Sequence, residues 1–157
     1  MSIEIIEEWS NMKVTYKGDY ALKAILDLAL HHDEGLVTIH EIAKRIDAPV
    51  KFLEQVLADL KKGGFVESRR GKIGGYLLSR PPHKIVLGEI VRFIDGPIEP
   101  ISCVRPGYSN CVDIRKCVFK GIWQRVSKAT SDIIDHITFE DLANQVKAKE
   151  NVLAYSI

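Results

Sequence analysis

The strongest constraint on the fold is a helix predicted between Pro49 and a pair of glycines, Gly63 and Gly64. Four apolar residues inside it recur at the i, i+3, i+4 and i+7 spacing of one buried helical face: Leu53, Val56, Leu57 and Leu60. Pro49 supplies the φ angle suited to a first helical position, and the glycines supply a stop. Lys51 and Gln55 fall on the opposite face, so they should point away from the core.

Two further helices are predicted ahead of this one. Residues 20–30 are almost all apolar, which indicates a helix buried on most sides. Thr38 and Glu41 have the spacing of a capping box, in which each side chain bonds a free backbone N–H of the first helical turn. The short helix that starts there should end near Ile46.

A hairpin and a fourth helix are predicted behind the glycines. Residues 65–68 and 76–79 have the composition of two strands, and a basic, glycine-rich tip joins them. A helix over residues 87–94 closes the unit. We therefore predict a mainly α fold with a small β-hairpin wing, which is the winged helix-turn-helix, followed by a long helix.

This order of elements is typical of proteins that bind double-stranded DNA. The third helix of such a unit can enter the major groove, and the wing lies over the backbone or the minor groove. Glu54 and Gln55 can bond cytosine and adenine edges, and Lys51 could meet guanine or phosphate. The wing residues expected at the DNA are Arg70, Gly71 and Lys72. Taken singly, each could be an ordinary solvated or turn residue, but together on consecutive elements they favour DNA.

The distribution of charge along the chain also favours DNA binding. The net charge is only +1, but residues 13–84 hold thirteen Lys and Arg against nine Asp and Glu, whereas residues 85–157 hold nine of each. No apolar run approaches the roughly 18 residues of a membrane span. The first eleven residues carry three glutamates and no basic residue, unlike a secretory signal. A cytoplasmic protein without a membrane partner is expected.

All three cysteines lie within one short stretch, at Cys103, Cys111 and Cys117. An odd number cannot pair fully, and disulfides are disfavoured in a reducing compartment. Clustered thiolates select zinc, copper(I) or iron–sulfur clusters. No Cys-x-x-Cys pair is present, so the spacing alone leaves both a metal site and three unconnected thiols open.

Three motifs resemble those of the Rrf2 family of transcription regulators: KVTYKGDYA at 13–21, FLEQ at 52–55, and Arg70-Gly71 followed by Gly74-Gly75-Tyr76. The resemblance runs from Met12 to about Gln145. It implies recognition-helix positions for Lys51, Glu54 and Gln55. It also implies that Arg70 enters the minor groove, and it gives contacts with the DNA backbone to Thr15 and Lys17.

A helix expected from Phe119 carries a wide apolar stripe, more than one small domain needs to cover. A last helix over 138–147 and an apolar tail follow it. The resemblance identifies the stripe-bearing helix as the family's dimerisation helix, so we expect a homodimer on an imperfect palindromic operator. A role in the core alone is the other interpretation of the stripe. The predicted interface residues are Phe119, Ile122, Trp123, Val126 and Ile133.

By the same resemblance the cysteine loop binds an iron–sulfur cluster, [2Fe–2S] in preference to [4Fe–4S]. Two features depart from cluster-binding members: seven residues rather than five separate the first two cysteines, and Lys120 stands where IscR-like members have a histidine ligand. A lysine ammonium cannot coordinate. Asp19 matches the aspartate with which NsrR-like members complete the cluster from the partner subunit. A helix-terminal carboxylate stabilised by the dipole is its other interpretation.

A cluster-free interpretation also stays open. The motif GPIEP at 96–100 and the apolar tail look like the CymR-like branch of the family, which senses through a partner enzyme. The protein would then regulate cysteine or sulfur metabolism under the control of a partner protein or of thiol oxidation. An enzyme is not expected, because no Cys-x-x-Cys or nucleophile motif is present.

The predicted organisation has four parts. They are an N-terminal extension over 1–11, the winged helix-turn-helix over 12–97, the cysteine loop over 98–118, and the dimerisation helix with the C-terminal tail over 119–157. The leading hypothesis is a regulator of iron–sulfur assembly, iron or sulfur genes that senses through its cluster.

Overall fold

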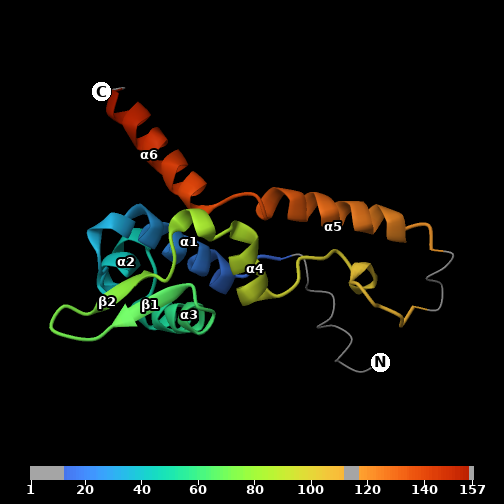
Figure 1. Ribbon diagram of the computed structural model, residues 1–157, viewed down its shortest axis with the longest axis horizontal. Coiled ribbons are helices and arrows are strands. Elements are labelled where there is room, and N and C mark those ends of the chain that lie inside the picture. The colour runs from blue at the N-terminus through green and yellow to red at the C-terminus, as the bar shows by residue number, and fades with distance from the viewer. Residues whose placement is uncertain (1–12, 112–116, 156–157) are drawn as a thin grey trace.

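Helices α1 to α4 and a β-hairpin pack together, and α5 and α6 extend from them (Figure 1). The computed structural model describes residues 13–111 and 117–155, so the predicted extension over 1–11 lies outside the described residues. The elements are α1 (Tyr16–Leu30), α2 (Ile39–Ile46), α3 (Val50–Lys62), β1 (Val66–Arg69), β2 (Gly75–Leu78), α4 (Leu87–Asp95), α5 (Lys120–Ile134) and α6 (Phe139–Tyr155). Short 3-10 turns lie at His32–Glu34, Pro82–Lys84 and Ser102–Val104. The predicted fold class, mainly helical with a small hairpin wing, is confirmed.

Local sequence signals mark both ends of α2 and the start of α3. The Thr38 backbone N–H donates to Glu41 Oε2 at 2.8 Å, and the Glu41 N–H donates back to Thr38 Oγ1 at 3.3 Å, so the predicted capping box starts α2. Pro49 is the N-cap of α3 rather than its first residue. Asp47 ends α2 in the left-handed conformation, at φ 52°.

Two helices are longer than the apolar pattern indicates. Helix α1 starts at Tyr16, four residues before the predicted start, because the Gly18 N–H donates to the Thr15 hydroxyl and caps the helix there. Helix α6 continues past the predicted end at residue 147 to Tyr155, through turns whose apolar residues Val152, Leu153 and Tyr155 are exposed. The strands are displaced by one residue from the predicted ranges.

The core lies between α1, α2, α3 and the hairpin. The four stripe residues of α3 are fully buried, as predicted, and they join Ala21, Ile25 and Leu28 of α1. Two residues of α6, Phe139 and Ala143, belong to the same buried cluster. The first turns of α6 therefore complete the core of the winged unit, although they follow the predicted dimerisation helix in sequence.

The hairpin is tied to the helices by backbone contacts. Strands β1 and β2 pair antiparallel, with Val66 opposite Leu78 and Arg69 opposite Gly75. Val37, which precedes the N-cap residue of α2, exchanges hydrogen bonds with Tyr76 at 3.0 and 2.8 Å. A Cβ atom on Gly75 would lie 2.7 Å from the Val37 carbonyl oxygen, so only glycine allows this approach.

Helix α5 projects from the body (Figure 1), and an ion pair links its C-terminal end to α4. Arg92 of α4 bonds the Asp135 carboxylate through both guanidinium nitrogens and donates to Ser131 Oγ at 3.1 Å. The Leu87 N–H also donates to the Ile137 carbonyl at 2.9 Å. None of the described helices is long and apolar enough to cross a bilayer.

Candidate nucleic-acid interface and cysteine loop

The polar face of α3 is open to solvent. Lys51, Glu54 and Gln55 are all exposed, while the stripe on the other face is buried. The outward orientation predicted for Lys51 and Gln55 is therefore found. Phe52 of the same helix packs edge-on against Tyr20 of α1, with ring centroids 5.4 Å apart, and this contact holds α3 against the body.

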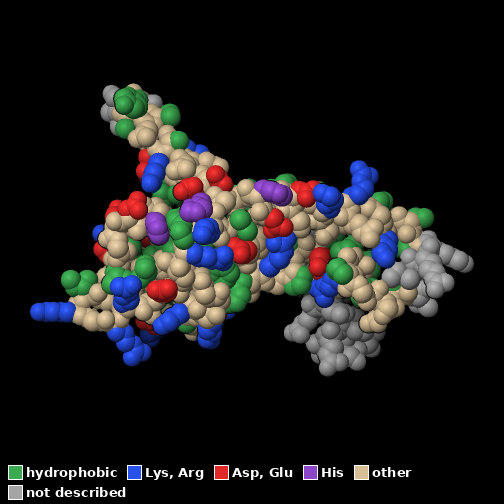
Figure 2. Space-filling view, viewed as in Figure 1, with side chains coloured by type: hydrophobic (Ala, Val, Ile, Leu, Met, Phe, Trp, Pro, Cys, Tyr) green, Lys and Arg blue, Asp and Glu red, His purple; other side chains and the backbone are tan. Residues whose placement is uncertain are grey.

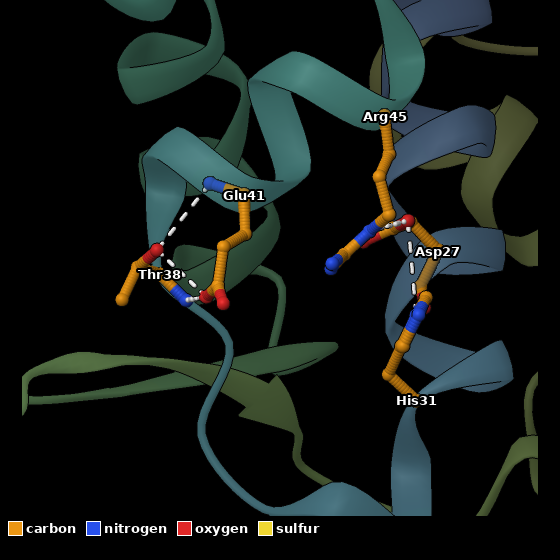
Figure 3. A network of polar contacts seen from close by, with 5 residues as sticks. All are labelled: Asp27, His31, Thr38, Glu41 and Arg45. Atoms are coloured by element: carbon orange, nitrogen blue, oxygen red, sulfur yellow. Dashed lines mark hydrogen bonds and ion pairs between the residues drawn. The ribbon is translucent and has the colours of Figure 1, made fainter.

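Helix α2 is fixed to α1 by a buried carboxylate (Figure 3). Asp27 is only 5% exposed and receives two hydrogen bonds from Arg45, from Nε at 2.7 Å and from the second guanidinium nitrogen at 2.9 Å. His31 Nδ1 lies 2.7 Å from the Asp27 carbonyl oxygen. Hydrogen bonding to Asp27 raises the pKa of Arg45 above its usual value. The network therefore links α2 to α1 at the edge of the core.

The wing presents its basic tip beside α3. Arg70, Gly71 and Lys72 are exposed, and Figure 2 shows Lys and Arg side chains gathered along the edge that the hairpin and α3 form. Lys61 near the end of α3 donates to Ser68 Oγ of β1 at 2.6 Å, which links the wing to the helix. The predicted base-facing and wing residues thus lie on adjacent elements.

Two exposed tip residues were not among the predicted contacts. Arg69 ends β1 with its side chain exposed, and Ile73 is 79% exposed between Lys72 and Gly74. Arg69 belongs to the same basic run as Arg70, so the sequence carried a signal for it. Ile73 falls inside the predicted tip, between the strands expected at 65–68 and 76–79, but an apolar side chain carries no sequence signal for a DNA contact.

The amino-terminal residues predicted to contact the DNA backbone are engaged within the chain. Thr15 caps α1 and bonds the Asp95 carboxylate at the end of α4. Lys17 Nζ lies 2.5 Å from Asp59 Oδ2 of α3. This hydrogen bond from Lys17 lowers the pKa of Asp59 below its usual value. The first turn of α1 is therefore held by both α3 and α4.

The predicted cluster ligands are not gathered into one site. Cys103 lies in the 3-10 turn at Ser102–Val104, and Cys103, Cys111 and Cys117 are all half-buried and free of disulfides. Over residues 13–111 and 117–155, no three His, Cys, Asp or Glu side chains are close enough to share a metal ion. Three thiols suit an iron–sulfur cluster chemically, but their described positions do not assemble a complete ligand set.

Asp19 forms a local pair instead of facing the cysteines. Its Oδ2 lies 2.6 Å from Lys23 Nζ, one helical turn away, and this hydrogen bond raises the pKa of Lys23. The predicted ligand role of Asp19 concerns a cluster in the partner subunit, which a single chain does not contain. That role stays a prediction.

The apolar stripe of α5 is largely uncovered. No described residue of α5 is buried, and Phe119, Ile122 and Ile133 are 60%, 52% and 61% exposed. Trp123 is 37% exposed and Val126 is half-buried. An apolar helix face of this size is typical of an interaction surface rather than of a core element.

Comparisons with known proteins agree with this arrangement. The model of the Rrf2 family, described as an iron-dependent transcriptional regulator, matches residues 14–145. An rrf2-like HTH-type transcriptional regulator of Rhodobacter capsulatus is 41% identical over 139 residues, which cover 82% of this chain and 91% of that protein. The regulator IscR of Pectobacterium carotovorum is 35% identical over 133 residues, covering 85% of this chain and 80% of IscR.

A solved structure extends the agreement to the fold. The structure of CymR, the global cysteine regulator of B. subtilis, superposes with a TM-score of 0.71 at 32% identity, covering 85% of this chain and 97% of that one. These relatives are transcription regulators and not enzymes. The chain belongs to the Rrf2 family and is a DNA-binding transcriptional regulator.

Proposed function

We propose that the protein binds a palindromic operator in double-stranded DNA as a homodimer, with α3 in the major groove and the wing at the minor groove. The observation that carries this proposal is the exposed edge formed by Lys51, Glu54 and Gln55 of α3 beside the basic tip at residues 70–72. In the dimer, each subunit would place one such edge on one half-site. The centres of the two half-sites would then lie about 34 Å apart along the DNA axis, or a multiple of that distance. The uncovered apolar face of α5 is the surface that would hold the two copies together.

The test is selection of duplexes from random-sequence DNA by the full-length protein. We expect an imperfect palindrome, and we expect Arg70→Ala to weaken binding at A·T-rich flanks and to reduce the slope of log K against log salt by about one. Lys149→Ala removes the same charge from the exposed surface of α6 and serves as the matched control. No selected sequence would contradict operator binding, and an unchanged slope for Arg70→Ala would remove the wing from the interface.

We further propose that Cys103, Cys111 and Cys117 hold one iron–sulfur cluster per subunit, [2Fe–2S] in preference to [4Fe–4S]. Support comes from the three free thiols in one loop and from the description of the matching family as iron-dependent. When bound, the cluster supplies a centre sensitive to oxidants and to iron supply. Lys120 offers no ligand, so Asp19 of the partner subunit is the proposed fourth donor.

Anaerobic purification tests the cluster. We expect a coloured protein with stoichiometric iron and sulfide, and bleaching when any one of the three cysteines is replaced by serine. Asp19→Ala should change the lifetime of the cluster more than the stability of the fold. A colourless protein after anaerobic reconstitution that still selects its operator would contradict the cluster proposal.

In that event the second candidate takes its place, a cluster-free regulator of cysteine or sulfur metabolism. The likeness to the global cysteine regulator of B. subtilis favours it. Control would come from a partner protein or from oxidation of the half-buried thiols. Under either proposal the protein acts on chromosomal DNA in the cytoplasm. The cluster-binding form would control genes of iron–sulfur assembly, iron or sulfur metabolism, and the cluster-free form genes of cysteine or sulfur metabolism.

A further inference from the structure

The junction between α1 and α4 holds a polar clasp that bridges 80 residues of sequence. The Thr15 backbone N–H donates to Asp95 Oδ2 at 3.0 Å, and the Thr15 hydroxyl donates to Asp95 Oδ1. Asp95 forms no ion pair with any residue in the described ranges, so Thr15 is its partner. The carboxylate is therefore committed to the first turn of α1.

Gly18 makes this clasp possible. It is buried in the first turn of α1, and a Cβ atom at this position would lie 2.1 Å from Asp95 Oδ2. A side chain there would push the carboxylate away from Thr15. Glycine is otherwise unfavourable inside a helix, so the close approach of Asp95 supplies a reason for its presence.

The clasp uses every hydrogen that Thr15 can donate. A threonine has one hydroxyl hydrogen and one backbone N–H, and both are bonded to Asp95. Thr15 thus has no donor left for a DNA phosphate while the clasp is closed. Lys17, two residues on, is held by Asp59 on the neighbouring α3.

We propose that Asp95 and Thr15 are positioning residues for operator binding: they hold the first turn of α1 beside α3, where Lys17 would leave Asp59 to meet a phosphate of the DNA backbone. This inference rests on the proposed operator binding. It replaces a direct phosphate contact by Thr15 with a positioning role, and it adds Asp95, which is the last residue of α4.

Asp95 also lies next to the cysteine loop in the sequence. Gly96 follows at φ +84°, and the cysteine loop begins two residues later. A cavity of about 250 Å³ lies at this point, and its lining includes Val14, Asp95, Ile98 and Ile134. A conformational change in the cysteine loop therefore has only a short stretch of chain to cross before it reaches the clasp at the start of α1. The cavity gives the side chains between them space to move.

The test uses the sign of the effect of Asp95→Ala on binding to a duplex that the wild-type protein has selected. Removing a negative charge near a DNA-contacting arm should tighten binding if Asp95 acts only through its charge. The positioning proposal expects the opposite, a loss of about tenfold, the equivalent of one hydrogen bond to a charged group. Asp95→Ala should also lower the salt slope, because Lys17 would no longer be placed at the backbone.

Asp141→Ala is the matched control. Asp141 bonds the backbone N–H and hydroxyl of Thr138 at the start of α6, in the same way but away from the arm. We expect it to lower thermal stability without changing operator affinity or salt slope. Thr15→Ser should keep the clasp and wild-type binding. Thr15→Val should show the same loss of affinity that is expected for Asp95→Ala, and it replaces Asp95→Ala in the test if that protein does not fold.

Gly18→Ala opens the clasp without replacing either polar partner, because the added Cβ atom displaces the Asp95 carboxylate. We expect it to weaken binding in the wild-type background and to have little further effect in the Asp95→Ala background. Wild-type affinity and salt slope for both Asp95→Ala and Gly18→Ala, or tighter binding by Asp95→Ala, would overturn the positioning role while leaving operator binding intact. If the wild-type protein selects no sequence at all, the proposed function itself fails.

Discussion

Arg45 of α2 donates two hydrogen bonds to the Asp27 carboxylate of α1, at 2.7 and 2.9 Å, and Asp27 is only 5% exposed. The arginine side chain is 34% exposed, so the pair lies at the edge of the core. Such a pair is costly to break from one side, because a buried carboxylate left alone has lost both its hydration and its counter-ion.

Arg45→Ala should therefore lower the free energy of unfolding by about 2 kcal/mol, below the range for fully buried pairs because solvent reaches the arginine. Urea denaturation would measure the loss. Lys128→Ala breaks the exposed i,i+4 pair with Asp132 on α5 and should cost less than about 0.5 kcal/mol. Equal effects of the two substitutions would show that the Asp27 pair contributes no more than a surface pair.

Stability should fall at acid pH through three carboxyls. Hydrogen bonds from Thr38 lower the pKa of Glu41 below its ordinary 4.5, and Lys17 and Thr138 lower the pKa values of Asp59 and Asp141 below their ordinary 3.8. A lowered pKa contributes stability that is complete above the unfolded value and is lost as pH falls through the folded one. The losses should thus begin near pH 4.5 for Glu41 and near pH 3.8 for the two aspartates.

Glu41→Gln isolates one of these contributions. The variant should be less stable than wild type at neutral pH and should lose less stability on acidification, because its side chain no longer titrates. Urea midpoints at several pH values would measure both differences. Glu67→Gln is the control and should follow the wild-type pH profile. Glu67 lies on β1 and has no hydrogen-bond or ion-pair partner in the described part of the chain. A wild-type profile for Glu41→Gln would argue against the capping contribution.

The exposed face of α5 should control assembly. Ile133 is 61% exposed and Ile122 52%, so a glutamate at either position would keep α5 folded but place a charge in an apolar interface. We expect Ile133→Glu to yield monomers or aggregates by analytical ultracentrifugation and to lose operator binding, since one half-site then binds alone. Gln145→Glu, at an exposed residue of α6, is the control for one added negative charge. A monomeric Ile133→Glu protein with full operator affinity would contradict the dimer model.

Gln55 should determine a base preference rather than overall affinity. Its side chain is exposed on the free face of α3, and a bidentate contact with adenine contributes about 1–3 kcal/mol of discrimination. Gln55→Ala should relax selection at one position of each half-site and leave the salt slope unchanged, whereas Lys51→Ala should reduce the slope if Lys51 meets phosphate. Selection from random duplexes by each variant provides the comparison. Unaltered selection by Gln55→Ala would exclude a base contact.

The sequence by itself determined the order of the elements and the outward face of α3. The signals for these are local: the Thr38–Glu41 capping box, the glycines after Lys62 and the four-residue stripe depend only on neighbours within a few turns. The basic wing was likewise evident, because its charges and glycines are contiguous. Family motifs then supplied the interpretation of these exposed residues as DNA contacts.

Only the tertiary structure decided which polar residues are committed inside the chain. Thr15 meets Asp95 across 80 residues, Asp27 meets Arg45 across 18, and Phe139 fills a core built mainly by residues 21–85. No short-range pattern encodes such partners, because they are set by how helices pack and not by periodicity along one helix. A carboxylate in sequence can be a surface charge, a metal ligand or a buried anchor, and its burial and its hydrogen-bond donors decide which of these it becomes.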